Sequence, residues 1–190
     1  MTKPVSVRPY RESDAEGWLV CRTLSFLRTA YYDDVKQTRP ELSAGAIELV
    51  AAAGDGEIVG ILDIVVDDVE ATIDTVAVLP GWQHDGVATE LLDQGIRGLD
   101  ARGVRTLDAW TREDVAANAW YRRNGFSETT RYLHVYLGAG DDPAGFRTPD
   151  GLSSPVTAFV HGRIEDEVEL RARYARVHVC RRYVRELTPR

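Results

Sequence analysis

Cysteine and histidine are scarce in this chain of 190 residues, and the few that occur are dispersed. Cys21 and Cys180 lie far apart, and neither has another cysteine or a histidine beside it at metal-ligand spacing. The four histidines are scattered as well: His84, His134, His161 and His178. The pattern predicts two reduced, partly buried thiols and no metal site.

Long hydrophobic runs are also missing. No segment approaches the roughly 18 consecutive apolar residues of a membrane span, and residues 1–17 contain no apolar signal core. The composition, 44% hydrophobic and 28% charged, is typical of a soluble globular protein. The length suits one domain with a core of its own. We therefore expect a single cytoplasmic domain over residues 1–190 that binds no membrane.

Positive charge is in deficit, because the formal net charge is −7 at pH 7. An acidic chain would repel a phosphate backbone, so nucleic-acid binding is not predicted. Lysine is limited to Lys3 and Lys36, and the Lys-Ser/Thr pair of a P-loop is absent. The dinucleotide fingerprint Gly-X-Gly-X-X-Gly is absent too. A pyrophosphate-bearing ligand of another kind is favoured over a dinucleotide or a nucleoside triphosphate.

Hydrophobic periodicity and turn signals predict a mixed order of strands and helices. Strands are predicted at residues 5–10, 46–53, 57–68, 70–79, 105–111 and 127–138, and two more after an irregular loop at 139–155. Helices are predicted to begin at Ser13 or Asp14, at Gly86 and at Asp114, with a second short helix within 28–45 and an acidic helical segment at 163–170. This order indicates α+β or mixed-sheet α/β architecture with helices packed on the sheet.

One short loop carries the clearest sign of a ligand. Pro80 and Gly81 end a strand, and residues 83–88 turn directly into a helix, so several amide N–H groups should point at one spot with the positive helix terminus behind them. Such a spot binds a phosphate or a pyrophosphate. Gly86 lets the chain approach that ligand closely, and the small Ala88 does not block it. A plain strand-to-helix connection is the alternative interpretation.

Two motifs resemble the GNAT superfamily of N-acetyltransferases. TVAVLPGWQHDGVATELL, residues 75–92, resembles the acetyl-CoA motif, in which an apolar-Ala-Val strand end is followed by Gln/Arg-X-X-Gly-X-Gly/Ala at the start of a helix. DVAANAWYRRNGF, residues 114–126, is similar to a later helix of the family, written as Asn, apolar residues and aromatic-Tyr-X-X-X-Gly-Phe. The motifs occur in the family's order. The resemblance implies a GNAT fold with its core over about 5–137 and a C-terminal β extension over about 155–190.

The resemblance also implies the residues that bind acetyl-CoA as a co-substrate. The backbone of Val76, Ala77 and Val78 would bind the acetyl and pantetheine part. The pyrophosphate would be surrounded by Gln83, His84, Asp85, Gly86, Val87 and Ala88. Asp114 stands where the family usually has an Asn that contacts the pantetheine or orients the cofactor.

Tyr121 matches the family's tyrosine that protonates the departing thiolate. The chemistry is reasonable, because a phenol of pKa near 10 within hydrogen-bond reach can donate a proton to a thiolate whose conjugate acid has a pKa near 8.5. The alternative interpretation places Trp120 and Phe126 in the core with Tyr121 merely half-buried.

The attacking amine must lose a proton, because an ammonium of pKa around 10 has no lone pair at neutral pH. If side chains alternate along the strand ATIDTVAV, then Thr72, Asp74, Val76 and Val78 share one face. Asp74 is then the candidate catalytic base or holder of a water. Alternative bases are Asp63, Glu70, His84 and an ordered water.

The segment after the first helix is the candidate acceptor site, because the first helices of this family usually form the acceptor pocket. Tyr31 and Tyr32 could provide aromatic walls, and Asp33 and Asp34 could dock a cationic amine. An amphipathic helix with a solvated acidic end is the alternative. Residues 156–190 could form a dimer seam, cover the acceptor cleft or simply be a strand with one face buried.

The sequence therefore predicts a single-domain enzyme that moves an acetyl group from acetyl-CoA directly to a primary amine. No Cys-His or Ser-His constellation for a covalent intermediate stands out in the sequence. The acceptor, a small molecule or a protein, is not identified. The alternative is a non-catalytic acyl-CoA sensor or interaction module on the same fold.

Overall fold

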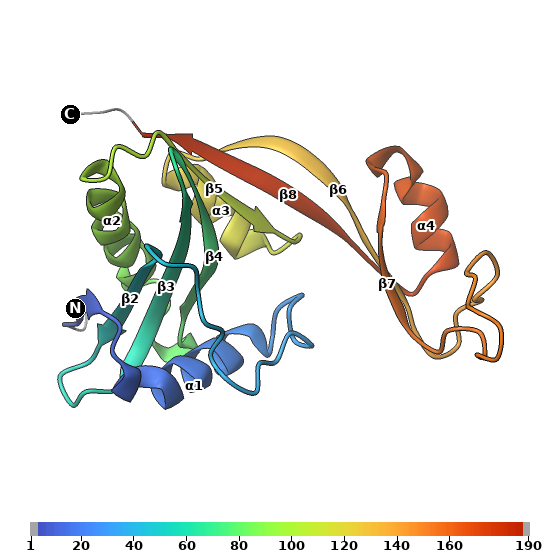
Figure 1. The fold of residues 1–190 in the computed structure, drawn as a ribbon, viewed down its shortest axis with the longest axis horizontal. Coiled ribbons are helices and arrows are strands. Elements are labelled where there is room, and N and C mark those ends of the chain that lie inside the picture. The colour runs from blue at the N-terminus through green and yellow to red at the C-terminus, as the bar shows by residue number, and fades with distance from the viewer. Residues whose placement is uncertain (1–3, 188–190) are drawn as a thin grey trace.

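The computed structural model describes residues 4–187, which form one mixed sheet and the helices packed on it (Figure 1). The order of the strands across the sheet is β1-β2-β3-β4-β5-β8-β6-β7. The strands are β1 Ser6–Pro9, β2 Ile47–Ala52, β3 Ile58–Asp67, β4 Glu70–Val78, β5 Thr106–Thr111, β6 Ser127–Leu137, β7 Ala158–Gly162 and β8 Arg176–Glu186. The helices are α1 Ala15–Phe26, α2 Val87–Asp100, α3 Val115–Arg123 and α4 Glu167–Arg173. Short 3-10 turns precede α1, α2 and α4: Glu12–Asp14, Pro80–Trp82 and Ile164–Asp166.

The mixed α/β architecture predicted from the sequence is confirmed, and one predicted element is wrong. No helix forms within 28–45, which consists of turns, bends and irregular chain. Ion pairs of its side chains hold this segment in place, whereas a helix would have been held by a buried apolar stripe. The Arg22 guanidinium lies 2.7 Å from the Asp34 carboxylate, and Arg39 lies 3.0 Å from Asp63.

The two faces of the sheet are covered by different helices. A Cβ on Gly60 of β3 would meet Val87 and Leu91, so this face packs against α2. Asp63, three residues later on the same strand, bonds to Trp18 of α1 and therefore lies on the opposite face. The main core fills both interfaces with residues from α1, α2 and the first five strands.

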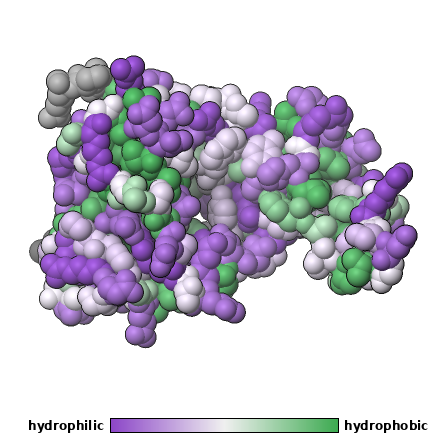
Figure 2. Space-filling view, in the orientation of Figure 1, coloured by the Kyte–Doolittle hydropathy of each residue, from purple (hydrophilic) through white to green (hydrophobic). Residues whose placement is uncertain are grey.

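The C-terminal β region is extended, and its last strand lies inside the sheet. β8 pairs with both β5 and β6, while β6 also pairs with β7. In Figure 1 β6 and β8 leave the main body together and carry α4 and β7 at their far end. A second cluster of buried residues, including Leu133, Val135, Val177 and Val179, stabilises that end. In Figure 2 hydrophobic and hydrophilic residues are mixed over its surface. No helix in the described part of the chain combines the length and apolar character needed to cross a membrane.

Candidate active site

The central feature is the place where β4 and β5 separate. The two strands pair in parallel only from Glu70 to Ile73 and from Thr106 to Ala109. Beyond these residues β4 pairs with β3 alone, and β5 pairs with β8 alone. Backbone edges of both strands therefore face an opening rather than each other.

A β-bulge at Asp74 marks the start of this opening. Ile73 pairs with Ile64, and Thr75 pairs with Asp63, the residue directly before Ile64, so Asp74 is the extra residue. The predicted common face of Thr72, Asp74, Val76 and Val78 is wrong, because the bulge shifts the alternation by one residue. The Asp74 side chain is exposed, and its carboxylate accepts a hydrogen bond from Thr75 Oγ1 at 3.0 Å.

The loop after β4 has the backbone geometry of an anion site. His84 and Gly86 both adopt left-handed conformations, with φ of 67° and 84°. Alternation of backbone handedness directs successive N–H groups into one concavity. Gly86 is also the N-cap of α2, so it has no side chain to satisfy the first amides of the helix. A Cβ on Gly86 would meet no atom within 4 Å, which leaves that side open.

The side chains of this loop have structural roles beside the open backbone. Gln83 Nε2 donates to the carbonyl of Val78 at 3.0 Å and fixes the loop to the end of β4. Val87 is buried against Gly60, and Ala88 packs on the same core. Val87 and Ala88 can therefore present only their backbone to a ligand. Asp85, between the two left-handed residues, is half-buried.

Asp114 caps α3. Its Oδ1 accepts a hydrogen bond from the Ala117 amide at 2.7 Å. Asn and Asp are equivalent at this position of a helix, so the departure from the family's usual Asn preserves the cap. Asn118, one turn later, donates to the carbonyls of Arg112 and Asp114 and joins the start of α3 to the end of β5.

Tyr121 lies in an aromatic cluster and is 4% exposed. Its ring stacks on Tyr183 with centroids 5.3 Å apart and meets Phe126 edge-on at 5.3 Å. Burial, and next the nearby phenol of Tyr31, raise the pKa of Tyr121 well above its usual value. The hydroxyl consequently stays protonated through the neutral range.

The four residues predicted to contact the acceptor lie together in the loop after α1. Tyr31 Oη accepts a hydrogen bond from the backbone N–H of Arg112, directly after β5, at 2.8 Å. The guanidinium of Arg176 stands over the Tyr32 ring at 4.6 Å. The remaining two, Asp33 and Asp34, already pair with arginines of this chain. Those pairs organise the loop and occupy the carboxylates that were expected to dock an amine.

Asp63, an alternative base, is enclosed rather than open. It is 1% exposed, and its carboxylate accepts hydrogen bonds from Trp18 Nε1 at 2.9 Å and from Arg39 at 3.0 Å. Burial raises the pKa of Asp63 to about 6, and the neighbouring Arg39 opposes the rise. Trp18 and Arg39 cover the carboxylate, which suits a structural role better than contact with a substrate.

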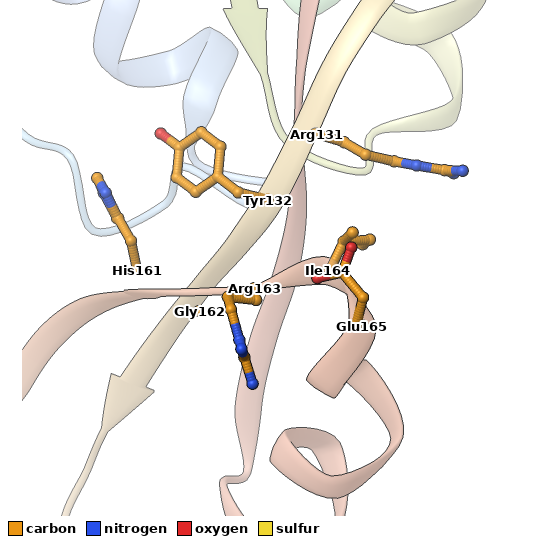
Figure 3. A pocket seen from close by; sticks show the side chains of 7 residues that line it. All are labelled: Arg131, Tyr132, His161, Gly162, Arg163, Ile164 and Glu165. Carbon is orange, nitrogen blue, oxygen red and sulfur yellow. The ribbon is translucent and has the colours of Figure 1, made fainter.

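A cluster of histidine and tyrosine side chains on the α1 face was missed by sequence reasoning. The register places His134 of β6 opposite both His178 of β8 and His161 of β7. Tyr132 Oη lies 3.0 Å from His134 Nε2, and Figure 3 shows Tyr132 and His161 pointing to the same side, away from Arg131. The alternation of residues in β6 and β8 was a usable signal, because it places Tyr132, His134 and His178 on one face of their strands. The contact between the two sets of side chains, however, depends on the pairing of β8 with β6.

Comparison with known proteins agrees with this geometry. A family model described as the acetyltransferase (GNAT) family matches residues 13–126. The chain therefore belongs to the GNAT acetyltransferase family.

Two curated relatives and one solved structure illustrate the similarity. The spore coat polysaccharide biosynthesis protein SpsD of Bacillus subtilis is 26% identical over 147 residues, 70% of this chain and 51% of that protein. The [ribosomal protein bS18]-alanine N-acetyltransferase of Escherichia coli is 41% identical over 77 residues, 40% of this chain and 51% of that protein. The match thus spans about half the length of each curated relative. The crystal structure of the ribosomal-protein-S18-alanine N-acetyltransferase from Escherichia coli shares the fold, with a TM-score of 0.62 and 17% sequence identity. The structural match covers 97% of this chain and 95% of that chain.

Proposed function

We propose that this protein transfers an acetyl group from acetyl-CoA directly to a primary amine. The observation that carries the proposal is that the opening between β4 and β5 is followed, along the same chain, by the loop of residues 83–88 with its geometry of an anion site. β4 separates from β5 at Asp74, and the loop that follows the end of β4 forms the left-handed turn at Gly86, twelve residues after Asp74. One ligand could therefore place a thioester in the opening and a pyrophosphate on the first turn of α2.

The donor would be held mainly by backbone. Amides around Gly86 and at the start of α2 would bind the pyrophosphate. Residues 76–78 offer the edge of β4 that no longer pairs with β5, and their peptide groups would hold the pantetheine arm and polarise the thioester carbonyl. Holding the two reactants in one opening would supply most of the acceleration.

The two faces of the sheet would serve the two reactants. Tyr183, on which Tyr121 stacks, is five residues from His178 on β8, so these side chains point to opposite faces. Tyr31, in the loop after α1, reaches the end of β5, where its hydroxyl accepts a hydrogen bond from the Arg112 amide. The amine would enter from the α1 side, and the thiolate would leave toward α3.

The proton transfers follow from these positions. The amine nitrogen forms the new C–N bond as the C–S bond breaks, and the thiolate takes the proton of Tyr121. The proton lost by the amine passes to Asp74 or to a water that Asp74 holds. Asp74 suits this role because it is exposed at the bulge where the opening begins.

The test is release of free thiol from acetyl-CoA in the presence of an amine panel. The panel contains a polyamine, free amino acids, an aminoglycoside, a lysine peptide and a peptide that begins with alanine, since the Escherichia coli relative is named for an alanine acceptor. At least one amine should accelerate thiol release. Binding of acetyl-CoA without acceleration by any amine would indicate a sensor and contradict the proposal.

Two glycine variants separate donor binding from general damage. Gly86 and Gly103 both have positive φ, 84° and 74°, and open space around a Cβ, so Glu strains the backbone similarly at either position. Gly86→Glu should abolish acetyl-CoA binding measured by calorimetry, because a carboxylate would meet the pyrophosphate. Gly103→Glu, at the other end of α2, should bind normally. Equal loss in both variants would argue against an anion site at Gly86.

A further inference from the structure

Two arginines, Arg112 and Arg176, hold the loop of residues 27–36, called here the acceptor loop. Arg176, at the start of β8, donates to both carboxylate oxygens of Asp33 at 2.6 and 2.8 Å and to the carbonyl of Ala30 at 3.1 Å. Arg112, directly after β5, donates to the same carbonyl and lies 3.7 Å from Asp33. The loop is thus fixed at two points to the strands beside the opening.

Each arginine is aligned by a histidine underneath it. Arg112 Nε donates to His134 Nδ1 at 3.2 Å, and Arg176 Nε donates to His178 Nε2 at 3.2 Å. A ring nitrogen that accepts a hydrogen bond carries a lone pair, so both bonds require a neutral imidazole. Burial, then the nearby Arg112, lowers the pKa of His134 to about 4, and burial lowers that of His178 although Glu113 opposes it. The sheet therefore keeps both acceptors neutral.

Aromatic rings enclose the same two guanidinium groups. The Tyr136 ring lies 5.3 Å from the Arg112 guanidinium and 3.9 Å from that of Arg176. Tyr31 stands 4.3 Å from Arg112 on the loop side. Each cation is therefore held by an aromatic ring and a histidine of the sheet, and its orientation is restricted on several sides.

We propose that Arg112 and Arg176, aligned by His134 and His178, are positioning residues that set the acceptor loop against the opening and so determine binding of the amine. This inference rests on the proposed acetyl transfer. Its geometric basis is Tyr31, whose hydroxyl accepts a hydrogen bond from the Arg112 amide directly after β5, at the edge of the opening. A loop released from the arginines would no longer form that wall of the site.

Paired substitutions isolate the histidine hydrogen bonds. His134→Asn puts an amide oxygen near the position of Nδ1, and His178→Gln puts one near the position of Nε2, so both retain an acceptor. His134→Phe and His178→Phe keep an aromatic ring and remove the acceptor. Each Phe variant should raise the KM for the amine about tenfold, as expected for loss of a hydrogen bond to a charged group. The kcat and the KM for acetyl-CoA should change less than twofold, and the Asn and Gln variants should behave like the unmodified protein.

Hydrogen exchange of the acceptor loop provides a readout that needs no turnover. Amides of residues 28–36 should exchange several times faster in the Phe variants than in the Asn and Gln variants, while amides of α2 stay unchanged. Unchanged loop exchange in the Phe variants would overturn the inference whether or not an acceptor is known. Equal effects of the Phe variants and their Asn or Gln counterparts would overturn it too. Faster loop exchange without any amine-dependent thiol release would contradict the proposed function and leave the arginine contacts confirmed.

Discussion

At the scale of single residues, Tyr121 combines a packing role with a chemical one. Its ring fills space between Tyr183 and Phe126, and a phenylalanine would fill the same space. The hydroxyl is therefore the part whose removal tests chemistry rather than folding. Tyr183 offers a comparison, because its hydroxyl donates to Asn118 at 2.8 Å inside the protein.

We expect Tyr121→Phe to lower kcat about 100-fold, the size of effect typical of a lost general acid. The KM for acetyl-CoA and the thermal midpoint should change little. The matched variant Tyr183→Phe should keep kcat within about twofold and lose about 1 kcal/mol of stability through its hydrogen bond to Asn118. Steady-state kinetics and thermal unfolding check both. A Tyr121→Phe enzyme with normal kcat would remove this residue from the mechanism.

At the scale of secondary-structure elements, two helices point their N-termini toward the site and differ in their caps. The N-cap of α3 is Asp114, whose carboxylate already satisfies an amide of the first turn. The N-cap of α2 is Gly86, which has no side chain. The first amides of α2 are therefore available to an external anion, whereas α3 supplies its own negative charge.

The cap of α3 leads to a prediction about stability. Asp114→Ala should lower the free energy of unfolding by about 1 kcal/mol, because the amide of Ala117 loses its acceptor. Asp114→Asn should retain most of that stability. Urea unfolding followed by circular dichroism measures the difference. A large loss in the Asn variant would mean that the charge, rather than the cap, stabilises this turn.

At the scale of the whole molecule, the enclosed carboxylate of Asp63 ties distant parts of the chain together. Arg39, from the long segment before β2, reaches Asp63 and also pairs with Glu48 of β2. Trp18 brings α1 into the same network. Helix, loop and sheet thus share one buried group whose protonation affects global stability.

The raised pKa of Asp63 determines the sign of its pH dependence. Its pKa is about 6 in the folded protein against about 3.9 when unfolded, so the folded state holds the proton more tightly. The contribution of Asp63 to the free energy of unfolding is fully present below about pH 4. It is lost as the pH rises through about 6, and the change is about 3 kcal/mol. Asp14 contributes with the opposite sign, because its hydrogen bonds from Arg8 lower its pKa.

The measurement is the free energy of unfolding in urea between pH 4 and pH 7. The contribution of Asp63 should make the unmodified protein less stable as the pH rises, and the Asp63→Asn variant should lack this decrease. Asp14→Asn should leave this decrease in place, because a carboxyl whose pKa is lowered changes its contribution to stability mainly below about pH 4. Identical pH profiles for the unmodified protein and Asp63→Asn would show that this carboxyl does not titrate as argued.

The sequence by itself determined the features that depend on neighbouring residues. Strand ends, the start of α2 at Gly86 and the cap of α3 at Asp114 follow from local backbone preferences, and the structure has them where they were predicted. The segment at 28–45 was wrongly predicted as a helix because its order comes from ion pairs with remote residues.

Only the tertiary structure decided the features that depend on pairing between distant strands. The bulge at Asp74 is a mismatch of register with β3, and alternation within β4 does not encode it. The contacts of Arg112 and Arg176 with the acceptor loop exist because β8 lies between β5 and β6. Such contacts join residues separated by more than 80 positions, and local propensity carries no information about a partner so far along the chain.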